Sequence, residues 1–250
     1  MNIRTLFLAL VSLTLVASML GCDGENPIAS VPLTPAGNSS LVSAPTSVSV
    51  PKLTVSANSV SAPERYGEAG ELRVTLTDDS VARYVVKEQL ASLDLPNNAV
   101  GSTDDIEGYI TFDSDGVIQE DHSRIRVDLS TLTSDKTRRD RYLRRNTFES
   151  DSFQFAEFIP RESPGLEWPM PKVGKLKFQL IGDMTIHGVT APLTWDVDVS
   201  IAPEGANGSA QTSFPFHTFD MEIPKLSFIL SVEDNIRLEL DLAIDVANLE

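Results

Sequence analysis

The chain has 250 residues, of which 41% are hydrophobic and 22% are charged, a composition typical of a soluble globular protein rather than of a disordered or multi-span membrane chain. Its 36 acidic and 20 basic residues give a formal charge of −16, which repels the nucleic-acid backbone and disfavours a nucleic-acid partner. The one cysteine excludes a disulfide within the chain and any multi-cysteine zinc or iron–sulfur site.

The amino-terminal segment has the features of an export signal. Arg4 precedes an apolar stretch of about 15 residues, from Leu6 to Leu20, which is shorter than the roughly 20 residues that a membrane-spanning helix needs. The stretch ends in Gly21-Cys22, which resembles the lipobox of bacterial lipoproteins. We interpret residues 1–21 as a lipoprotein signal peptide and Cys22 as the acylated first residue, which would anchor the exported protein to the extracellular or periplasmic side of the cell membrane. A plain secretory signal with a cysteine nearby is the alternative.

Residues 22–67 are rich in proline and serine and contain few charges. Such a segment lacks the apolar side chains needed for a core, and its prolines favour extended backbone. We therefore predict a disordered tether between the membrane and a folded domain at residues 68–250. An edge strand around Val48–Val55 is the alternative interpretation.

Apolar residues alternate with polar ones through most of the predicted domain, which indicates strands with one solvated face. The alternation is strictest from Ile236 to Ile244, where Arg237, Glu239 and Asp241 separate the apolar positions. Turn residues separate the runs at Asp113–Gly116, Glu204–Gly208 and Glu233–Asn235. About eight strands that do not alternate with helices along the chain predict an antiparallel barrel or sandwich. The other alternating runs are 72–77, 106–112, 124–129, 176–180 and 193–201.

One segment has helical character. Ser134 or Asp135 can cap a helix over residues 136–145, with Tyr142 and Leu143 facing inward. Six of these ten residues are basic. They either contact lipid phosphates or membrane headgroups, or pair with nearby acids. The candidate acids are Asp128, Asp140 and Glu149.

The sequence contains no recognisable catalytic or metal-binding motif. His122, His187 and His217 lie far apart without the spacing of metal ligands, and His187 is expected to be a turn or packing residue. There is no Gly-x-Ser-x-Gly elbow, phosphate-binding loop or His-Glu-x-x-His. The acidic pairs Asp78-Asp79 and Asp104-Asp105 are expected in solvated loops. We predict neither an enzyme nor a metal site.

Four segments resemble, in order, the pattern of the YceI-like family of polyisoprenoid-binding proteins. The last is the most extensive, with Gly182-Asp183-Met184-Thr185-Ile186-His187-Gly188-Val189-Thr190-Ala191-Pro192 matching the family's Gly-x-Leu-Thr-Ile-x-Gly-Val-Thr-x-Pro hairpin. The resemblance covers roughly residues 70–248. The three preceding segments are Ser130–Ser134, Arg139–Leu143 and Phe153–Phe158.

The resemblance implies an all-β fold, an extended eight-stranded antiparallel lipocalin-like barrel with one short helix, that encloses a long isoprenoid chain. Such a ligand needs apolar area rather than catalytic groups, and a barrel of this size can hold one small ligand. No other cofactor is expected. The large apolar residues expected to face inward are the candidate ligand-binding residues: Tyr84, Val86, Ile110, Phe112, Leu143, Phe148, Phe155, Phe178, Leu180 and Trp195.

Two functional hypotheses follow. The first is a membrane-tethered protein that binds an isoprenoid or a similar amphiphilic lipid without turnover. The second is a barrel filled by its own side chains, which serves as an acidic cell-surface interaction module. A cavity along the barrel interior favours the first hypothesis, and a packed interior favours the second.

Overall fold

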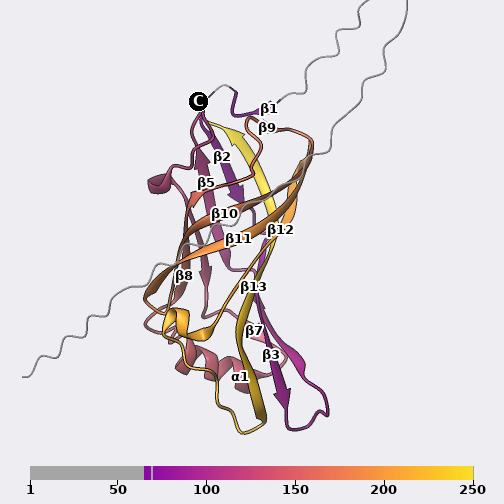
Figure 1. Ribbon diagram of the computed structural model, residues 1–250, viewed down its shortest axis with the longest axis vertical. Helices are drawn as coiled ribbons and strands as arrows, with labels where there is room; N and C mark the ends of the chain where they lie inside the picture. Colours follow the sequence, from indigo (N-terminus) through magenta and orange to yellow (C-terminus); the bar gives the residue numbers. More distant parts are fainter. Residues whose placement is uncertain (1–64, 69, 250) are drawn as a thin grey trace, which may run out of the picture. The chain divides into compact units, whose positions relative to one another are not determined.

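The computed structural model describes residues 65–68 and 70–249, so the predicted signal peptide, Cys22 and the tether up to residue 64 lie outside the described residues. The described chain is mostly strands (Figure 1). Their bounds are β1 Arg65–Tyr66, β2 Leu72–Leu76, β3 Val81–Leu90, β4 Asn97–Thr103, β5 Ile106–Phe112, β6 Arg124–Asp128, β7 Thr133–Ser134, β8 Phe155–Glu162, β9 Met170–Pro171, β10 Gly174–Ile186, β11 Val189–Ala202, β12 Gly205–Phe214 and β13 Ile229–Asn248.

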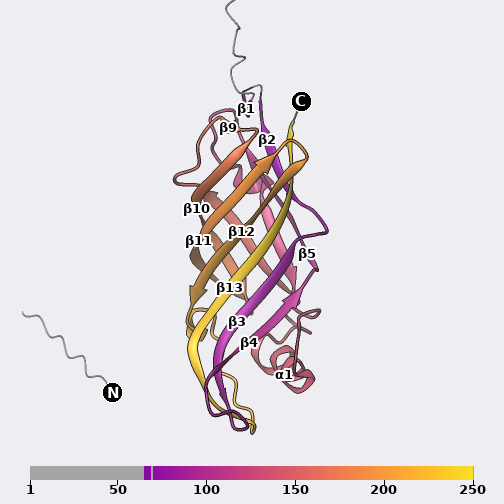
Figure 2. The ribbon, with the colours of Figure 1, turned by 90° about the vertical axis from the view of Figure 1, so that its right-hand side faces the viewer.

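Eight strands form a closed antiparallel barrel, as predicted. Around the ring they follow the order β13, β12, β11, β10, β8, β6, β5 and β2, and β2 pairs with β13 again. Strands β3, β4 and β7 extend the sheet from β13 at the end of the barrel where α1 lies (Figure 2). Because the ring closes, its inner face is shielded from water and collects the apolar side of each strand.

Strand β13 is 20 residues long and joins both parts of the sheet. One edge pairs with β12, and the other pairs first with β3 and then with β2. Between β2 and β3, the buried Ser80 hydroxyl donates to the Ala243 carbonyl at 3.0 Å and accepts from the Ala243 amide at 3.1 Å. The serine side chain therefore replaces the backbone pairing where the partner strand bends.

All six alternating runs lie in strands apart from the last residues of two of them, Thr77 and Leu129, but two predicted turns differ. The turn predicted at Glu233–Asn235 lies within β13, where the pairing register with β3 shifts between Val232 and Ile236. The turn predicted at Glu204–Gly208 is shorter, because β12 begins at Gly205. The Gly182–Pro192 segment forms the β10–β11 hairpin, and its turn contains His187 at φ 52° and Gly188 at φ 73°. His187 is thus a turn residue, and its ring packs edge-on against Phe153 at 5.0 Å.

The predicted helix is present as α1 (Thr137–Tyr142), which continues into a π-helical turn over Leu143–Thr147. The predicted caps are wrong: Lys136 occupies the N-cap position, and no side chain caps the helix. Asp135 pairs instead with Arg139 at 2.7 Å. Leu143 is buried and Tyr142 is partly buried, as expected. Two short 3-10 helices, Glu120–His122 and Phe216–Phe219, complete the fold.

The end of the barrel opposite α1 is covered by Trp168. Its ring packs against Phe112 with centroids 5.5 Å apart, and its indole nitrogen donates to the Ser114 carbonyl at 3.0 Å. Gly67 and Gly116 lie against the indole, and both have positive φ angles. A Cβ atom at Gly116 would lie 2.6 Å from the Trp168 ring, so only glycine fits there.

We expect Gly116→Ala to lower the free energy of unfolding by about 2 to 4 kcal/mol, because the new methyl group adds a clash with Trp168 to the cost of a positive φ. Chemical denaturation measures the loss. Gly174→Ala is the matched control, because Gly174 also has a positive φ but no atom within 4 Å of its added Cβ. Equal losses in the two variants would contradict the role of Trp168 as a fixed cover.

Candidate ligand-binding site

A narrow apolar cavity of about 190 Å³ occupies the barrel interior. Along β10 its lining extends from Leu176 to Ile186, ten residue steps that span about 33 Å. The lining is almost entirely apolar, so the cavity suits a hydrocarbon chain rather than a polar ligand.

Strand alternation and small residues together create this cavity. On β10 and β11 every second side chain is buried, which directs Leu180 and Trp195 inward at paired positions. A barrel of eight strands is narrow enough for large side chains to fill it. Here several lining positions are alanine, so space remains between the large residues: Ala82, Ala99, Ala156, Ala206 and Ala210.

Nine of the ten predicted ligand-binding residues line the cavity: Tyr84, Val86, Ile110, Phe112, Leu143, Phe148, Phe178, Leu180 and Trp195. They come from strands around the ring, from β3 and from the α1 segment. Phe112 lies toward the end covered by Trp168, whereas Leu143 and Phe148 lie at the α1 end. The set therefore follows the whole cavity rather than one pocket within it.

The inward placement of Phe155 is wrong. Its ring is 37% exposed on the outer face of β8, and the Arg126 guanidinium lies 3.8 Å from the ring centroid. Ala156 and Phe158 face inward in its place. The polar Glu157, which shares the parity of Phe155, is the sequence signal that identifies this side of the strand as the solvated one.

The sequence interpretation did not include several lining residues. Phe158, Met184 and Ile186 continue the inward faces of β8 and β10 and could have been found by extending the alternation. Phe216 and Met221 belong to an irregular segment after β12, where no periodic pattern identifies a buried side chain. The interpretation also omitted four polar lining residues, Arg83, Glu88, Arg139 and Thr147.

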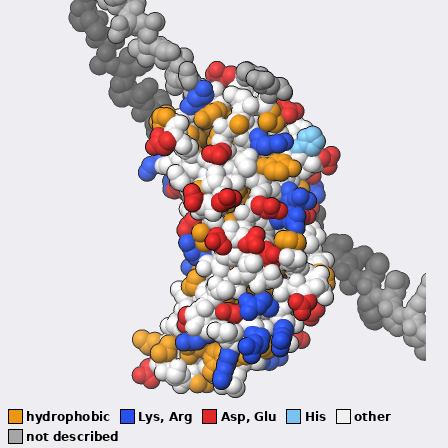
Figure 3. Space-filling model, turned by 180° about the vertical axis from the view of Figure 1, so that it is seen from behind, with side chains coloured by type: hydrophobic (Ala, Val, Ile, Leu, Met, Phe, Trp, Pro, Cys, Tyr) orange, Lys and Arg blue, Asp and Glu red, His pale blue; other side chains and the backbone are white. Residues whose placement is uncertain are grey.

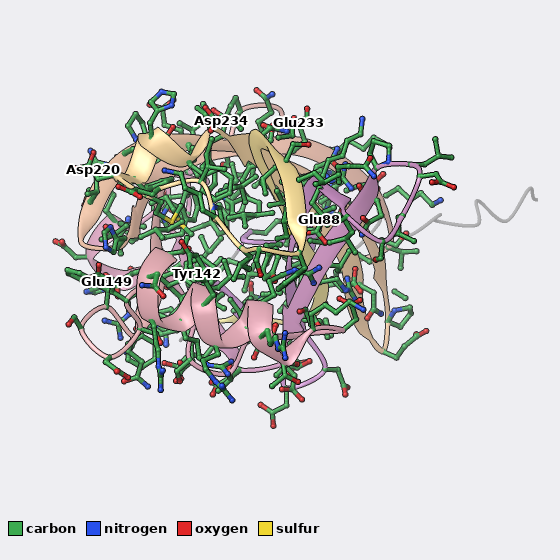
Figure 4. All side chains as sticks on the ribbon, turned by 90° about the horizontal axis from the view of Figure 1, so that it is seen from below. Glu88, Tyr142, Glu149, Asp220, Glu233 and Asp234 are labelled. Carbon is green, nitrogen blue, oxygen red and sulfur yellow. The ribbon has the colours of Figure 1, made fainter. Side chains whose placement is uncertain are left out.

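Glu88 and Arg139 form a buried ion pair at the α1 end of the cavity, which Figure 4 views from below. Each residue is only 3% exposed. The Arg139 guanidinium also donates to Asp135 at 2.7 Å and to the Ser134 hydroxyl at 3.1 Å, and Ser134 donates to the buried Asp140 carboxyl. These contacts join β3, β7 and α1, so the ion pair fixes the helix against the barrel wall.

Burial lowers the pKa of Arg139, but the hydrogen bond to Asp135 and the charge of Glu88 outweigh it and hold the pKa above its ordinary value. Arg139 therefore carries a charge at the polar end of a largely apolar lining. For Tyr84, burial raises the pKa to about 12, although the neighbouring Arg139 charge opposes the shift. The tyrosine is neutral and can donate a hydrogen bond.

Four lining residues carry buried polar atoms without a hydrogen-bond partner among the described residues: Tyr84 Oη, Arg139 Nε, Thr147 Oγ1 and Trp195 Nε1. Such atoms are rare in folded proteins, because leaving one unpaired costs about 1 to 3 kcal/mol. Tyr84 and Arg139 belong to the polar α1 end, and Thr147 lies on the adjoining π-helical turn. This end can therefore hydrogen-bond a polar group in the cavity.

Comparison with known proteins identifies the family. The YceI-like domain matches residues 77–244, which is more than half of the chain. The chain belongs to the YceI-like family. Compared with curated proteins, it shows no significant sequence match.

Two solved structures share the YceI-like barrel. Burkholderia cenocepacia BcnA is 15% identical, with a TM-score of 0.50, and the match covers 69% of this chain and 99% of that one. A polyisoprenoid-binding domain from Saccharophagus degradans, implicated in plant cell wall breakdown, is 12% identical, with a TM-score of 0.53 and coverage of 70% and 98%. At these identities the likeness shows the fold, and it confirms the architecture expected from the resemblance.

The structure gives physical roles to two of the YceI-like segments. The Arg139-Asp140 pair supplies the buried contacts of α1, and the Gly182–Pro192 segment supplies a long hairpin of the ring. Gly182 is required for close packing, because a Cβ atom there would lie 2.2 Å from the Ile159 carbonyl oxygen on β8. The resemblance thus lies in residues that shape the barrel and close its α1 end.

Within residues 65–68 and 70–249, no three His, Cys, Asp or Glu side chains lie close enough to hold a metal ion. His187 lies 3.8 Å from Glu149, and His217 lies 3.8 Å from Asp234. No helix in the same part of the chain is long and apolar enough to cross a membrane.

We expect the stability of the YceI-like barrel to fall between pH 10 and pH 12 through Tyr84. Its folded pKa of about 12 exceeds the ordinary 10.0, so the folded state holds the proton more tightly and loses this advantage as the pH rises. At pH 11 the loss amounts to about 1.4 kcal/mol. Chemical denaturation at pH 9 and pH 11 should show a smaller decrease for Tyr84→Phe than for the unaltered protein. Equal decreases would contradict the shift.

Proposed function

We propose that this YceI-like protein binds one long-chain isoprenoid or a similar amphiphilic lipid inside its barrel, without catalytic turnover. We further propose that it does so while tethered through an acylated Cys22 to the outer side of the cytoplasmic membrane. The observation that carries the binding proposal is the narrow apolar cavity that follows the barrel from the Trp168 end to the α1 end.

Burial of its apolar surface would be enough to stabilise a hydrocarbon chain in this cavity. At about 25 cal/mol per Å², burying a few hundred Å² contributes several kcal/mol before the entropic cost of association. The side chains around the ring supply hydrocarbon contacts along the whole length, as a chain without polar atoms requires. The cavity thus favours the lipid-binding hypothesis over a barrel filled by its own side chains.

The polar end of the cavity favours an uncharged headgroup. The buried Arg139 guanidinium is already paired with Glu88 and Asp135, and the buried Asp140 carboxyl lies close by. A phosphate placed inside the cavity would have to compete with these carboxyl groups for Arg139, whereas a hydroxyl or a quinone carbonyl can accept from Arg139 Nε or Tyr84 Oη without displacing them. The proposed ligand therefore lies with its head at α1 and its chain toward Trp168.

The shared barrel fold of the similar solved structures supports this proposal. The Saccharophagus degradans neighbour is described as a polyisoprenoid-binding domain, and its barrel aligns with 70% of this chain. The cavity, the alternation and the polar end described above belong to this chain itself. They support the same class of ligand by independent physical reasoning.

We expect native mass spectrometry of the chain from residue 22, with Cys22→Ser and purified without detergent, to show an apolar adduct at one per chain. Ala210→Leu adds three carbons inside the cavity and should reduce adduct occupancy several-fold through loss of space. Ala247→Leu adds the same atoms at an exposed position on β13 and should leave occupancy unchanged.

The same preparation tests the headgroup. Long-chain prenols and quinones should bind more tightly than the corresponding prenyl phosphates in titrations monitored by the adduct mass. No adduct and no uptake of any of these lipids would contradict the binding proposal and favour the interaction module.

The membrane tether has a separate test. The full chain expressed with its signal should yield a protein that begins at Cys22 and has the added mass of acyl chains, and Cys22→Ser should abolish that mass. Recovery of an unacylated amino terminus from the unaltered chain would contradict the lipoprotein interpretation.

A further inference from the structure

The exposed face of the α1 segment is basic and unpaired. Arg138, Arg141 and Arg145 are exposed and make no ion pair with any residue in the described part of the chain. The acids expected to neutralise the segment have other partners. Asp128 accepts from Ser130 and Gln154, Asp140 accepts from Ser134, and Glu149 lies near His187. The three named acids therefore do not pair with the helix, and Asp135 and Glu88 pair with Lys136 and Arg139 instead.

Three leucines are exposed at the same end of the barrel. Leu93 and Leu95 lie in the turn between β3 and β4, and Leu230 lies at the beginning of β13; they are 46%, 75% and 68% exposed. A backbone hydrogen bond of 3.0 Å from the Ala91 amide to the Phe228 carbonyl holds the two segments together. Figure 3 shows hydrophobic side chains beside a group of Lys and Arg side chains at this end. Asp94 is the one acid within the turn.

The charges at this end are separated by side. Figure 4 places Asp220, Glu233 and Asp234 on the side opposite α1, and Glu149 beside α1. An anionic surface that approaches the α1 side would therefore meet the three arginines before Asp220, Glu233 and Asp234. Because the whole chain carries a charge of −16, this side is a local exception to the overall field.

The cavity lies close to the surface at the same end. A shallow hollow lined by residues 223–227 and 229–232 shares Pro224 and Val232 with the cavity lining. The loop that forms it is joined to α1 by a hydrogen bond of 3.4 Å from the Lys225 amide to the Tyr142 hydroxyl. A surface held against α1 would therefore lie beside a hollow that borders the cavity.

We propose that the α1 end docks on an anionic phospholipid surface. Arg138, Arg141 and Arg145 contact lipid phosphates, and the three exposed leucines enter the headgroup region. The docked face is the one through which the lipid ligand of the proposed function passes, so this inference extends that function and rests on it. Exposed apolar side chains combined with basic residues are the physical signature of such a surface.

The proposed anchor permits this orientation. Cys22 precedes Arg65 by 65 − 22 = 43 residues, and an extended chain of that length reaches up to about 150 Å. The 20 residues of β13 span only about 66 Å. The available chain length therefore allows either end of the barrel to meet the membrane.

The test measures vesicle binding of the chain from residue 22 with Cys22→Ser, so that no acyl anchor contributes. In flotation assays the protein should bind vesicles containing phosphatidylglycerol, bind phosphatidylcholine vesicles weakly, and lose affinity with added salt. R138Q/R141Q/R145Q should lower the partition coefficient roughly 100-fold. L93S/L95S/L230S should also lower it, with both variants keeping their circular dichroism spectra.

Two control variants match these changes at other places. K175Q/K177Q/R237Q removes three positive charges from exposed positions on β10 and β13, and V117S/V173S removes exposed apolar side chains outside the leucine cluster. Both should bind vesicles like the unaltered protein. Equal binding of the arginine variant and its control, or equal binding to both vesicle types, would overturn the proposal. The adduct mass of the same samples reports separately on ligand binding, so failure of docking and failure of the proposed function are distinguishable.

Discussion

The closure of the sheet by β13 is the constraint on which the rest of the molecule depends. A strand of this length is paired along both edges, with β12 on one side and with β3 and β2 in turn on the other. Its solvated face adds cross-strand attraction, since Arg83 on β3 donates to Asp241 at 2.5 Å and holds the pKa of that carboxyl below its ordinary value. Without closure, the inward faces of eight strands would border water instead of one another. The cavity exists because every edge around it is paired.

Closure alone does not produce a cavity, because large side chains can fill a barrel of eight strands. The space results from alanine at positions whose neighbours are large, such as Ala210 beside Val197 on β11 and Leu240 on β13. A larger side chain at each of these positions would make more dispersion contacts and bury more apolar area. The folded protein is therefore less stable than it would be with a filled interior. The unpaired polar atoms of Tyr84 and Arg139 add a further cost. A bound amphiphile would recover both losses, which gives the empty space and the unpaired atoms a common physical explanation.

The sequence predicts the strands well, because a sheet with one wet face repeats every two residues, as between Ile236 and Ile244. It predicts the orientation of side chains less well where apolar residues occur on both sides of a strand: the sequence places Phe155 inward, whereas Ala156 and Phe158 form the inner face. Strand β12 has weak alternation because small and polar residues dominate it, and the polar run Glu233–Asn235 resembles a turn although pairing continues through it as an irregularity. The buried pair of Glu88 and Arg139 depends on residues 51 positions apart. Local sequence patterns cannot predict a contact between residues so far apart. The resemblance to the YceI-like family includes Arg139 in one of its segments but does not identify Glu88 as its partner.

The two ends of the barrel differ in chemistry, and this difference gives the cavity a direction. At one end Trp168 packs against Gly67, Gly116 and the lining residue Phe112 and is hydrogen-bonded to Ser114, so this end is apolar and its contacts tolerate no added atoms. At the other end the cover is a short helix and an irregular loop, with charged groups beneath it and unpaired arginines above it. An amphiphile oriented by these groups would place its chain toward Trp168 and its head at the polar α1 end. Selectivity for the head and exchange with a membrane would then depend on the same few residues around α1, which is where a single substitution can alter both.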